Sequence, residues 1–183
     1  MTAPSRRRYP IRYAIQRWRD LSWFYGGLLV ATIVLIAVKP LVRQPEDPWI
    51  FAAAIICAVF LIGLWLMRVF SYVEVTDDRV RVRYVTRRLE LPYSRLSRVR
   101  RQPLEVAFQP AERRRFVNGF VRRLAKQPAA YIRLDRRQDG IVEEAERRLG
   151  PRFVTGADVV VPLVGVDDFV AEMKERLRGQ PGA

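Results

Sequence analysis

Two long apolar runs constrain the fold of this chain more than any other feature of its sequence. The first extends from Leu21 to Val38 and the second from Trp49 to Met67, and neither contains a charged residue. Each is about 18 to 19 residues long, close to the roughly 20 that a helix needs to cross a hydrocarbon core of about 30 Å. Prolines in the short segment between the runs break the helix there. The runs therefore predict a transmembrane hairpin within residues 21–69.

Charge on either side of the hairpin predicts its orientation. The chain of 183 residues has 33 Lys plus Arg against 19 Asp plus Glu. Six arginines precede the first run and Arg68 follows the second. In the connecting segment two basic residues are balanced by Glu46 and Asp47. Because basic residues concentrate on the cytoplasmic side of membrane proteins, both termini are expected in the cytoplasm and the short loop outside.

The N-terminal region leaves alternatives open. A secretory signal would also begin with positive charge, but the first run is longer than a signal core and a second run follows it, so we expect a signal anchor that begins a hairpin. The basic arm, residues 1–20, interleaves Tyr9 and Trp18 with arginines, which suits a segment lying in the headgroup layer. The alternative is a disordered, solvated arm. Neither span contains Asp, Glu, Lys or Arg, so we expect an anchor and not an ion path.

The composition argues against catalysis. The chain has no His and a single cysteine, Cys57, inside the second apolar run. It therefore lacks the commonest general base and metal ligand, and it cannot build a disulfide or a cysteine zinc site within one monomer. The acidic pairs Asp77-Asp78 and Asp167-Asp168 are expected in a turn and at a helix start. Ser94 and Ser97 have no neighbouring base to activate them. We predict no catalytic residue, no metal site and no cofactor.

From residue 70 the pattern changes to alternation of apolar and charged residues. Val80, Val82 and Tyr84 alternate with arginines after a turn at residues 76–78. This period of two predicts a half-buried strand with its arginines outward, and short segments of this kind joined by tight turns indicate an antiparallel meander. Further strand segments are expected at residues 72–75, 89–93, 104–108, 131–134, 153–154 and 159–163.

The order of these segments resembles the membrane-anchored bacterial pleckstrin-homology-like family. Two apolar helices precede YVEVTDDRV at residues 72–80, a second strand and LPYSRLSRV at residues 91–99. In that family a strand, a T-D-D/N-R turn, a strand and an I-P-x-x-x-I-x-x-V segment recur in this order. The chain departs from the family at Val85-Thr86, where members commonly carry a glycine, and in its arginine-rich stretch after Phe108. The resemblance implies an open antiparallel barrel with one end covered by a C-terminal helix, in a bacterial inner membrane.

The arginine-rich stretch, residues 110–126, has apolar residues at helical spacing and basic residues at most other positions. Such a basic amphipathic helix could rest on an anionic leaflet. The alternative is an insertion helix that packs its apolar face on the barrel and leaves its arginines in water. The candidate residues for anionic-lipid contact are Arg113, Arg114, Arg115, Arg122, Arg123 and Lys126.

The last third of the chain predicts two helices. Residues 141–149 are rich in paired charges, and residues 166–178 place apolar side chains on one face, with acids in the first turn and bases in the last. The expected fold is α+β: a basic arm (1–20), a two-helix transmembrane hairpin (21–69), a pleckstrin-homology-like antiparallel barrel or sandwich with a helical insertion and a C-terminal helix (70–178), and a frayed tail (179–183).

These expectations favour a non-catalytic module held at the membrane. The resemblance implies protein–protein interaction or self-association at the cytoplasmic face. The alternative is that the arginine-rich surface binds anionic lipid or another polyanion. We expect no nucleic-acid partner, because the basic patch has no reading motif or aromatic platform beside it.

Overall fold

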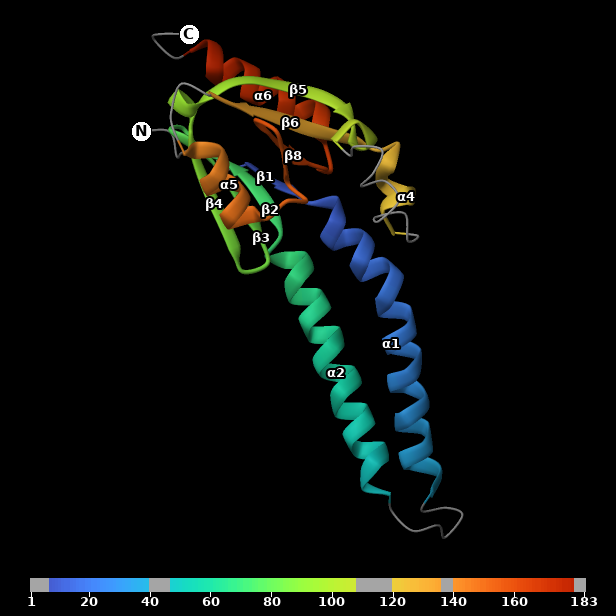
Figure 1. Ribbon diagram of the computed structural model, residues 1–183. Helices are drawn as coiled ribbons and strands as arrows, with labels where there is room; N and C mark the ends of the chain where they lie inside the picture. The colour runs from blue at the N-terminus through green and yellow to red at the C-terminus, as the bar shows by residue number, and fades with distance from the viewer. Residues whose placement is uncertain (1–6, 40–46, 108–119, 136–139, 180–183) are drawn as a thin grey trace, which may run out of the picture. The chain divides into compact units, whose positions relative to one another are not determined.

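The computed structural model describes residues 7–39, 47–107, 120–135 and 140–179, and the side chains of residues 120–122 are not included. The chain forms two compact units (Figure 1). The helix unit is Tyr13–Phe70, and the sheet unit combines Met1–Arg12 with Ser71–Ala183. The fold is α+β, as predicted, with two long apolar helices followed by two antiparallel sheets and a C-terminal helix.

The helix unit contains α1 (Arg12–Val38) and α2 (Pro48–Val69). Both are long and apolar enough to cross a membrane. The side chain of Asp47 accepts a hydrogen bond from the Trp49 amide at 3.0 Å and so caps α2, while Pro48 occupies a first-turn position where its missing N–H costs nothing. The rings of Tyr25 and Phe60 stack at 5.1 Å between centroids and hold the two helices together.

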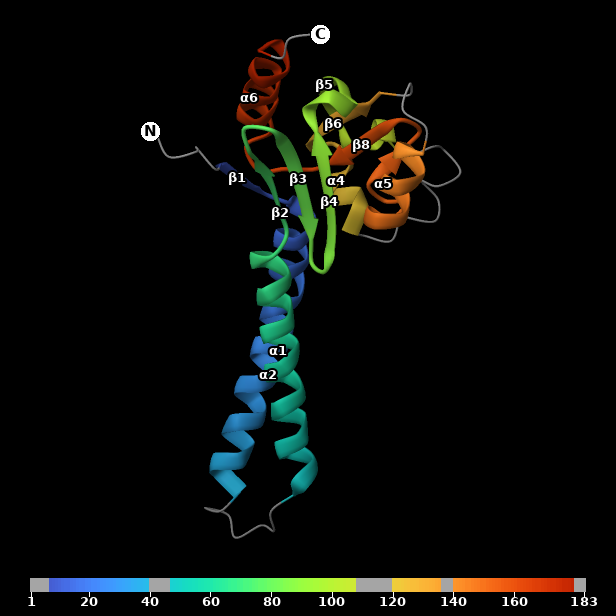
Figure 2. The same ribbon diagram turned by 90° about the vertical axis from the view of Figure 1, so that its left-hand side faces the viewer.

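The first sheet is a meander with the order β1-β2-β3-β4. Figure 2 shows its strands side by side. As the alternation predicted, the valines and leucines of β2 (Tyr72–Val75), β3 (Arg79–Tyr84) and β4 (Arg87–Pro92) are buried on one face and the charged side chains lie on the other. The turn predicted at residues 76–78 joins β2 to β3.

Strand β1 (Arg7–Pro10) was not expected. It pairs antiparallel with β2, from Arg7 opposite Val75 to Pro10 opposite Tyr72. Residues 1–20 were predicted to form an arm in the headgroup layer or in solvent, and the structure differs from both interpretations. Residues 7–10 belong to the sheet, and α1 already begins at Arg12, nine residues before the uncharged run. The strand forms because Tyr9 is buried opposite Val73.

The second sheet has the order β5-β6-β8-β7. It comprises β5 (Leu96–Pro103), β6 (Pro128–Leu134), β7 (Val154–Thr155) and β8 (Asp158–Val161). The strand predicted at residues 104–108 is wrong, because Leu104–Ala107 form a 3-10 helix, η3. Pro103 ends the ladder of β5, and the chain turns there with Leu104 fully buried.

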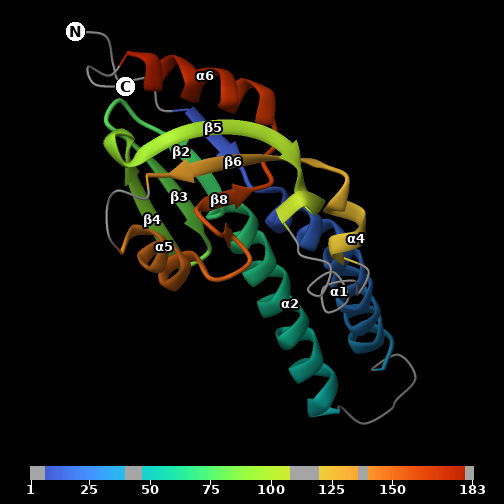
Figure 3. The ribbon, with the colours of Figure 1, turned by 45° about the horizontal axis from the view of Figure 1, so that its top comes forward.

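Among the described residues, three α-helices belong to the sheet unit. The predicted helices α5 (Ile141–Leu149) and α6 (Val166–Arg178) are confirmed, and α4 (Phe120–Ala125) covers the described part of the predicted basic helix. Helix α6 packs on β5 and β6, as Figure 3 shows, and buries Phe169 and Met173 completely. The Phe169 ring also meets Tyr9 of β1 edge to face at 5.2 Å, so α6 closes the space between the two sheets.

The sheet unit has two ends that differ in chemistry. The entry end is where the chain leaves for the helix unit and returns from it: the Ile11 amide donates to the Ser71 carbonyl at 3.1 Å, and the Arg12 amide donates to the Pro162 carbonyl at 2.8 Å. The far end lies at the other end of β2. It contains the β2–β3 turn and the 3-10 helix η2 (Tyr93–Arg95), joined by a 2.6 Å hydrogen bond from the Tyr93 hydroxyl to the Thr76 carbonyl.

Candidate functional site

The six residues predicted to contact lipid are only partly described. Arg113, Arg114 and Arg115 lie outside the described residues, and Arg122 belongs to α4 without a described side chain. Arg123 and Lys126 are exposed, and Leu124 beside them is buried. The described end of the segment thus has the amphipathic character that the spacing predicted.

Hydrogen bonds place the end of α4 at the entry end of the sheet unit. Arg12 donates from Nη1 to Gln127 Oε1 at 2.8 Å and from Nε to the Leu163 carbonyl at 2.8 Å. The Gln127 amide donates to the Leu124 carbonyl at 2.9 Å, and the Gln127 carbonyl accepts from Leu104 at 3.0 Å. The residue at which α1 begins is therefore joined directly to the residue that follows Lys126.

The β3–β4 turn adds arginines to the same end. The Val85 amide donates to Ser71 Oγ at 3.2 Å, which ties the turn to the residue where the chain re-enters the sheet unit. Arg83 and Arg88 face each other across the two strands. Arg87 reaches the end of α5 and donates to the Leu149 carbonyl at 2.7 Å, an interaction that the helix dipole favours.

Gly150 makes room for this contact between Arg87 and α5. It has φ +88°, and a Cβ there would collide with Arg87 Nη1. A side chain at this position would displace the guanidinium from the helix end, which explains why a glycine ends α5.

An ion-pair ladder covers the outer face of the first sheet. Glu74 is only 2% exposed and accepts from Arg8 at 3.2 Å and Arg81 at 3.2 Å, so it links three neighbouring strands. Glu90 accepts from Arg79 at 2.9 Å and from Arg81 at 3.0 Å. The pKa of Glu90 is lowered to about 2, chiefly by its hydrogen bond with Arg79 and then by Arg88. The arginines expected on this face are thus largely engaged in holding the sheet together.

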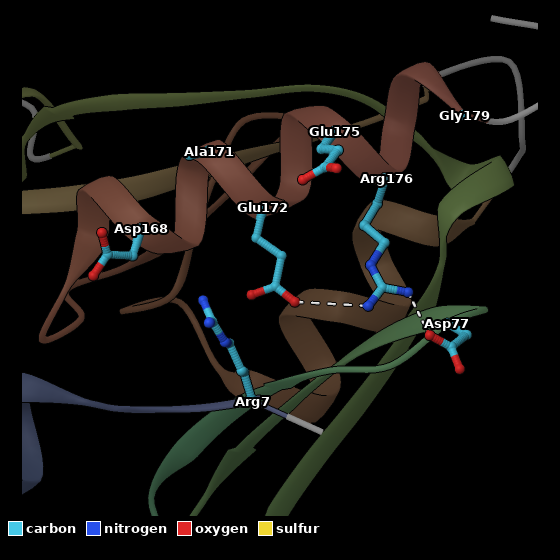
Figure 4. A pocket seen from close by; sticks show the side chains of 8 residues that line it. All are labelled: Arg7, Asp77, Asp168, Ala171, Glu172, Glu175, Arg176 and Gly179. Carbon is cyan, nitrogen blue, oxygen red and sulfur yellow. Dashed lines mark hydrogen bonds and ion pairs between the residues drawn. The ribbon is translucent and has the colours of Figure 1, made fainter. Parts of the chain in front are cut away.

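A polar pocket of about 790 Å³ lies toward the far end, between α6, the start of β1 and the β2–β3 turn (Figure 4). Arg176 bridges its two sides, with 2.5 Å to Asp77 and 3.7 Å to Glu172. Glu172 also accepts from the Tyr9 hydroxyl at 2.6 Å. The pocket is lined by Arg7, Asp77, Asp168, Ala171, Glu172, Glu175, Arg176 and Gly179.

The electrostatics of the pocket suit binding more than proton transfer. Burial, and then the hydrogen bond to Glu172, raise the pKa of Tyr9 to about 12. Burial likewise raises the pKa of Tyr93 at this end to about 12. Both hydroxyls therefore stay protonated near neutral pH and donate. Asp168 and Glu175 have no ion-pair partner among the described residues, so the pocket presents carboxylates to solvent.

The two acidic pairs identified in the sequence lie at the expected places. Asp78 accepts from Thr76 Oγ1 at 3.1 Å within the β2–β3 turn. Asp167 and Asp168 lie in the first turn of α6, and Asp167 pairs with Arg101 at 2.9 Å. Within the ranges that the structure describes, no group of three or more His, Cys, Asp or Glu could hold a metal ion.

Sequence reasoning missed the pocket because its residues come from distant segments. Tyr9 and Glu172 are 163 positions apart, and Arg176 and Asp77 are 99 apart. Glu172 carried one signal: it follows the buried Phe169 at a spacing that places it on the edge of the apolar face of α6.

Comparison of the chain with protein-family models, with curated proteins and with solved structures finds no match.

Proposed function

We propose that the chain is a non-catalytic, membrane-anchored module of the pleckstrin-homology-like type that binds a protein partner or a second copy of itself. In this proposal α1 and α2 cross the bacterial inner membrane, and the sheet unit stands in the cytoplasm. The single observation that carries the proposal is the pairing of β1 with β2, since these neighbouring strands are separated in the chain by the two apolar helices.

This connection constrains the topology of any membrane insertion. Pro10 and Tyr72 are partners in one ladder, so the chain must leave and re-enter the sheet unit on the same side of the bilayer. Two spans satisfy this requirement, whereas one span cannot. The arginines before and after the hairpin favour the cytoplasm as that side.

The far end supports interaction as the task of the sheet unit. Its pocket is lined by the carboxylates of Asp168 and Glu175 and by the bridging Arg176, an arrangement suited to a partner segment that carries a basic side chain. Ala171 lines the same pocket and is exposed, so this face of α6 is accessible in the described sheet unit.

Site-specific photo-crosslinking of the full-length chain in native membranes tests the interaction. A photoreactive residue replacing Ala171 should give one discrete adduct, either with a single protein or with a second copy, and the D168K/E175K double substitution should abolish it. The matched control replaces Glu146, which is exposed on α5. Identical adducts from both positions, or an Ala171 adduct that survives the charge reversal, would contradict the proposal.

Cysteine accessibility tests the topology separately. The chain has one cysteine, so C57S provides a cysteine-free background. We expect a membrane-impermeant maleimide to label Q44C in the connecting segment on intact cells and to label S97C in the sheet unit only after permeabilisation. Labelling of S97C on intact cells would place the sheet unit outside.

A further inference from the structure

We propose that the entry end of the sheet unit is a docking surface for anionic phospholipid headgroups. Two basic groups form it: the β3–β4 turn, with Arg83 and Arg88, and the end of α4, with Arg123 and Lys126. The inference rests on the membrane anchoring proposed above and adds a contact that the tether alone does not require.

The chain itself brings the β3–β4 turn to the bilayer surface. Helix α2 ends at Val69, and Ser71 follows two residues later. Two residues span at most about 7 Å. Because the Val85 amide lies 3.2 Å from Ser71 Oγ, the tip of the turn is within roughly 10 Å of the end of the candidate span. That distance is comparable with the depth of a headgroup layer.

The same reasoning applies to the end of α4. Arg12 is the first residue of α1, and its guanidinium binds Gln127, which directly follows Lys126. A shallow hollow of about 270 Å³ lies beside Lys126 and is also lined by Arg101 and Gln102. Lys126 has no ion-pair partner among the described residues, so its charge can meet a phosphate there.

Like charges face each other at this end, and an anionic surface would relieve their repulsion. Arg83 and Arg88 are directly opposite in the ladder, and like charges in this arrangement repel. Arg88 shares Glu90 with two other arginines. Each basic residue near an anionic leaflet contributes about fivefold to its binding constant.

The tip of the turn has a residue that suits a lipid boundary better than water. Val85 has φ +56°, a left-handed conformation that glycine or asparagine adopts more readily than a β-branched residue. Val85 is half-buried in the sheet unit, and in water the rest of its apolar side chain gains nothing. Among headgroups and upper acyl chains, its burial offsets the strain.

Spin-label accessibility of the full-length chain in nanodiscs tests the proposal. A label at T86C in the C57S background should move toward the acyl region when neutral phosphatidylcholine is partly replaced by phosphatidylglycerol, and high salt should reverse the shift. This comparison uses the unaltered basic residues, so it does not depend on whether a charge variant folds. No difference between the two lipid compositions would overturn the proposal.

Matched charge removal then locates the surface. R83Q/R88Q/K126Q removes three charges from the entry end. It should lower the equilibrium constant for contact between the tethered sheet unit and the anionic leaflet by about 100-fold. R95Q/R98Q/K174Q removes the same charge elsewhere on the sheet unit and should leave it nearly unchanged. An equal loss in both variants would mean non-specific attraction and would also overturn the proposal. Failure of the chain to insert into nanodiscs would contradict the anchoring itself, which is a separate outcome.

Discussion

The entry end and the far end of the sheet unit are built from the same short strands yet offer opposite chemistry. At the entry end, Arg12, Arg83 and Lys126 surround the points where the chain joins its two apolar helices. At the far end, Asp77 and Glu172 line a pocket in which carboxylates outnumber guanidinium groups. The unit is therefore polarised along its strands, although its overall charge is strongly positive.

In the two proposals made above, this difference separates anchoring from recognition. Cations next to a bilayer attract anionic headgroups, whereas the same cations around the pocket would repel a basic partner. The tyrosines show that both ends are nevertheless firmly packed: Tyr9 and Tyr93 donate at the far end, and Tyr131 donates to the Pro103 carbonyl at 2.8 Å at the end of β5 near α4.

The largest expected effect comes from breaking the packing that closes the space between the two sheets. Phe169 is fully buried and contacts Tyr9, so F169A should lower the free energy of unfolding by about 3–5 kcal/mol. All four tryptophans precede Arg68, so their fluorescence does not report on the sheet unit. Urea-dependent pulse proteolysis in nanodiscs measures its unfolding instead. L177A, a half-buried position on the same helix, is the control; equal losses would mean that Phe169 does not close the sheets.

The elements that the sequence predicted are those whose two faces differ in polarity over their whole length. Strands β2 to β4 alternate valine or leucine with charge, and α5 and α6 have apolar residues at helical spacing. Strand β1 was not predicted because it is four residues long, begins among arginines and finds its partner Glu74 66 positions away. Leu104 to Ala107 alternate like a strand, but burial of Leu104 after Pro103 turns the chain instead.

The candidate sites could likewise be predicted only where the signal is local in the sequence. A local density of arginine identified residues 113–126, and Arg123 and Lys126 do lie at the entry end. Arg83 and Arg88 join them only through strand register, which composition does not reveal. The pocket brings together the first strand and the last helix, a proximity that depends on how the sheets close.

Ionisation of a single buried tyrosine at alkaline pH should weaken the sheet unit by the next largest amount. The pKa values of Tyr9, Tyr93 and Tyr131 are each raised to about 12, in every case chiefly by burial. The folded state therefore holds these protons more tightly than the unfolded state. The resulting stability is complete below the unfolded pKa of about 10 and is lost as the pH rises toward 12, by roughly 2 kcal/mol per tyrosine.

Single tyrosine variants show which end of the sheet unit accounts for the loss of stability at alkaline pH. Y9F and Y93F alter the far end and Y131F the region near α4, and each should flatten the decline in pulse-proteolysis stability between pH 9.5 and pH 11.5. Each should also lose about 1 kcal/mol at neutral pH with its hydrogen bond. A pH profile that none of the three changes would show that other groups control alkaline unfolding.

A smaller effect is expected from breaking the ion-pair ladder on the outer face of the first sheet. E74Q leaves Arg8 and Arg81 with a neutral partner, and because Arg8 is 61% exposed its charge returns to water. We expect a loss of about 1 kcal/mol, well below the cost of breaking a fully buried pair. E146Q, at an exposed position on α5, should change the stability by less. A loss of more than about 3 kcal/mol in E74Q would mean that β1 depends on this carboxylate.

The smallest effect separates stability from membrane contact at the entry end. V85N replaces a β-branched residue at φ +56° with one that tolerates this conformation, so the sheet unit should gain about 0.5–1 kcal/mol in neutral nanodiscs. The same change removes the apolar tip and should reduce the lipid-dependent shift of a label nearby. The two measurements must therefore move in opposite directions. T86N, one position later and without a positive φ, should leave the stability unchanged. If V85N stabilises the unit and preserves the shift, the arginines alone hold the turn at the bilayer.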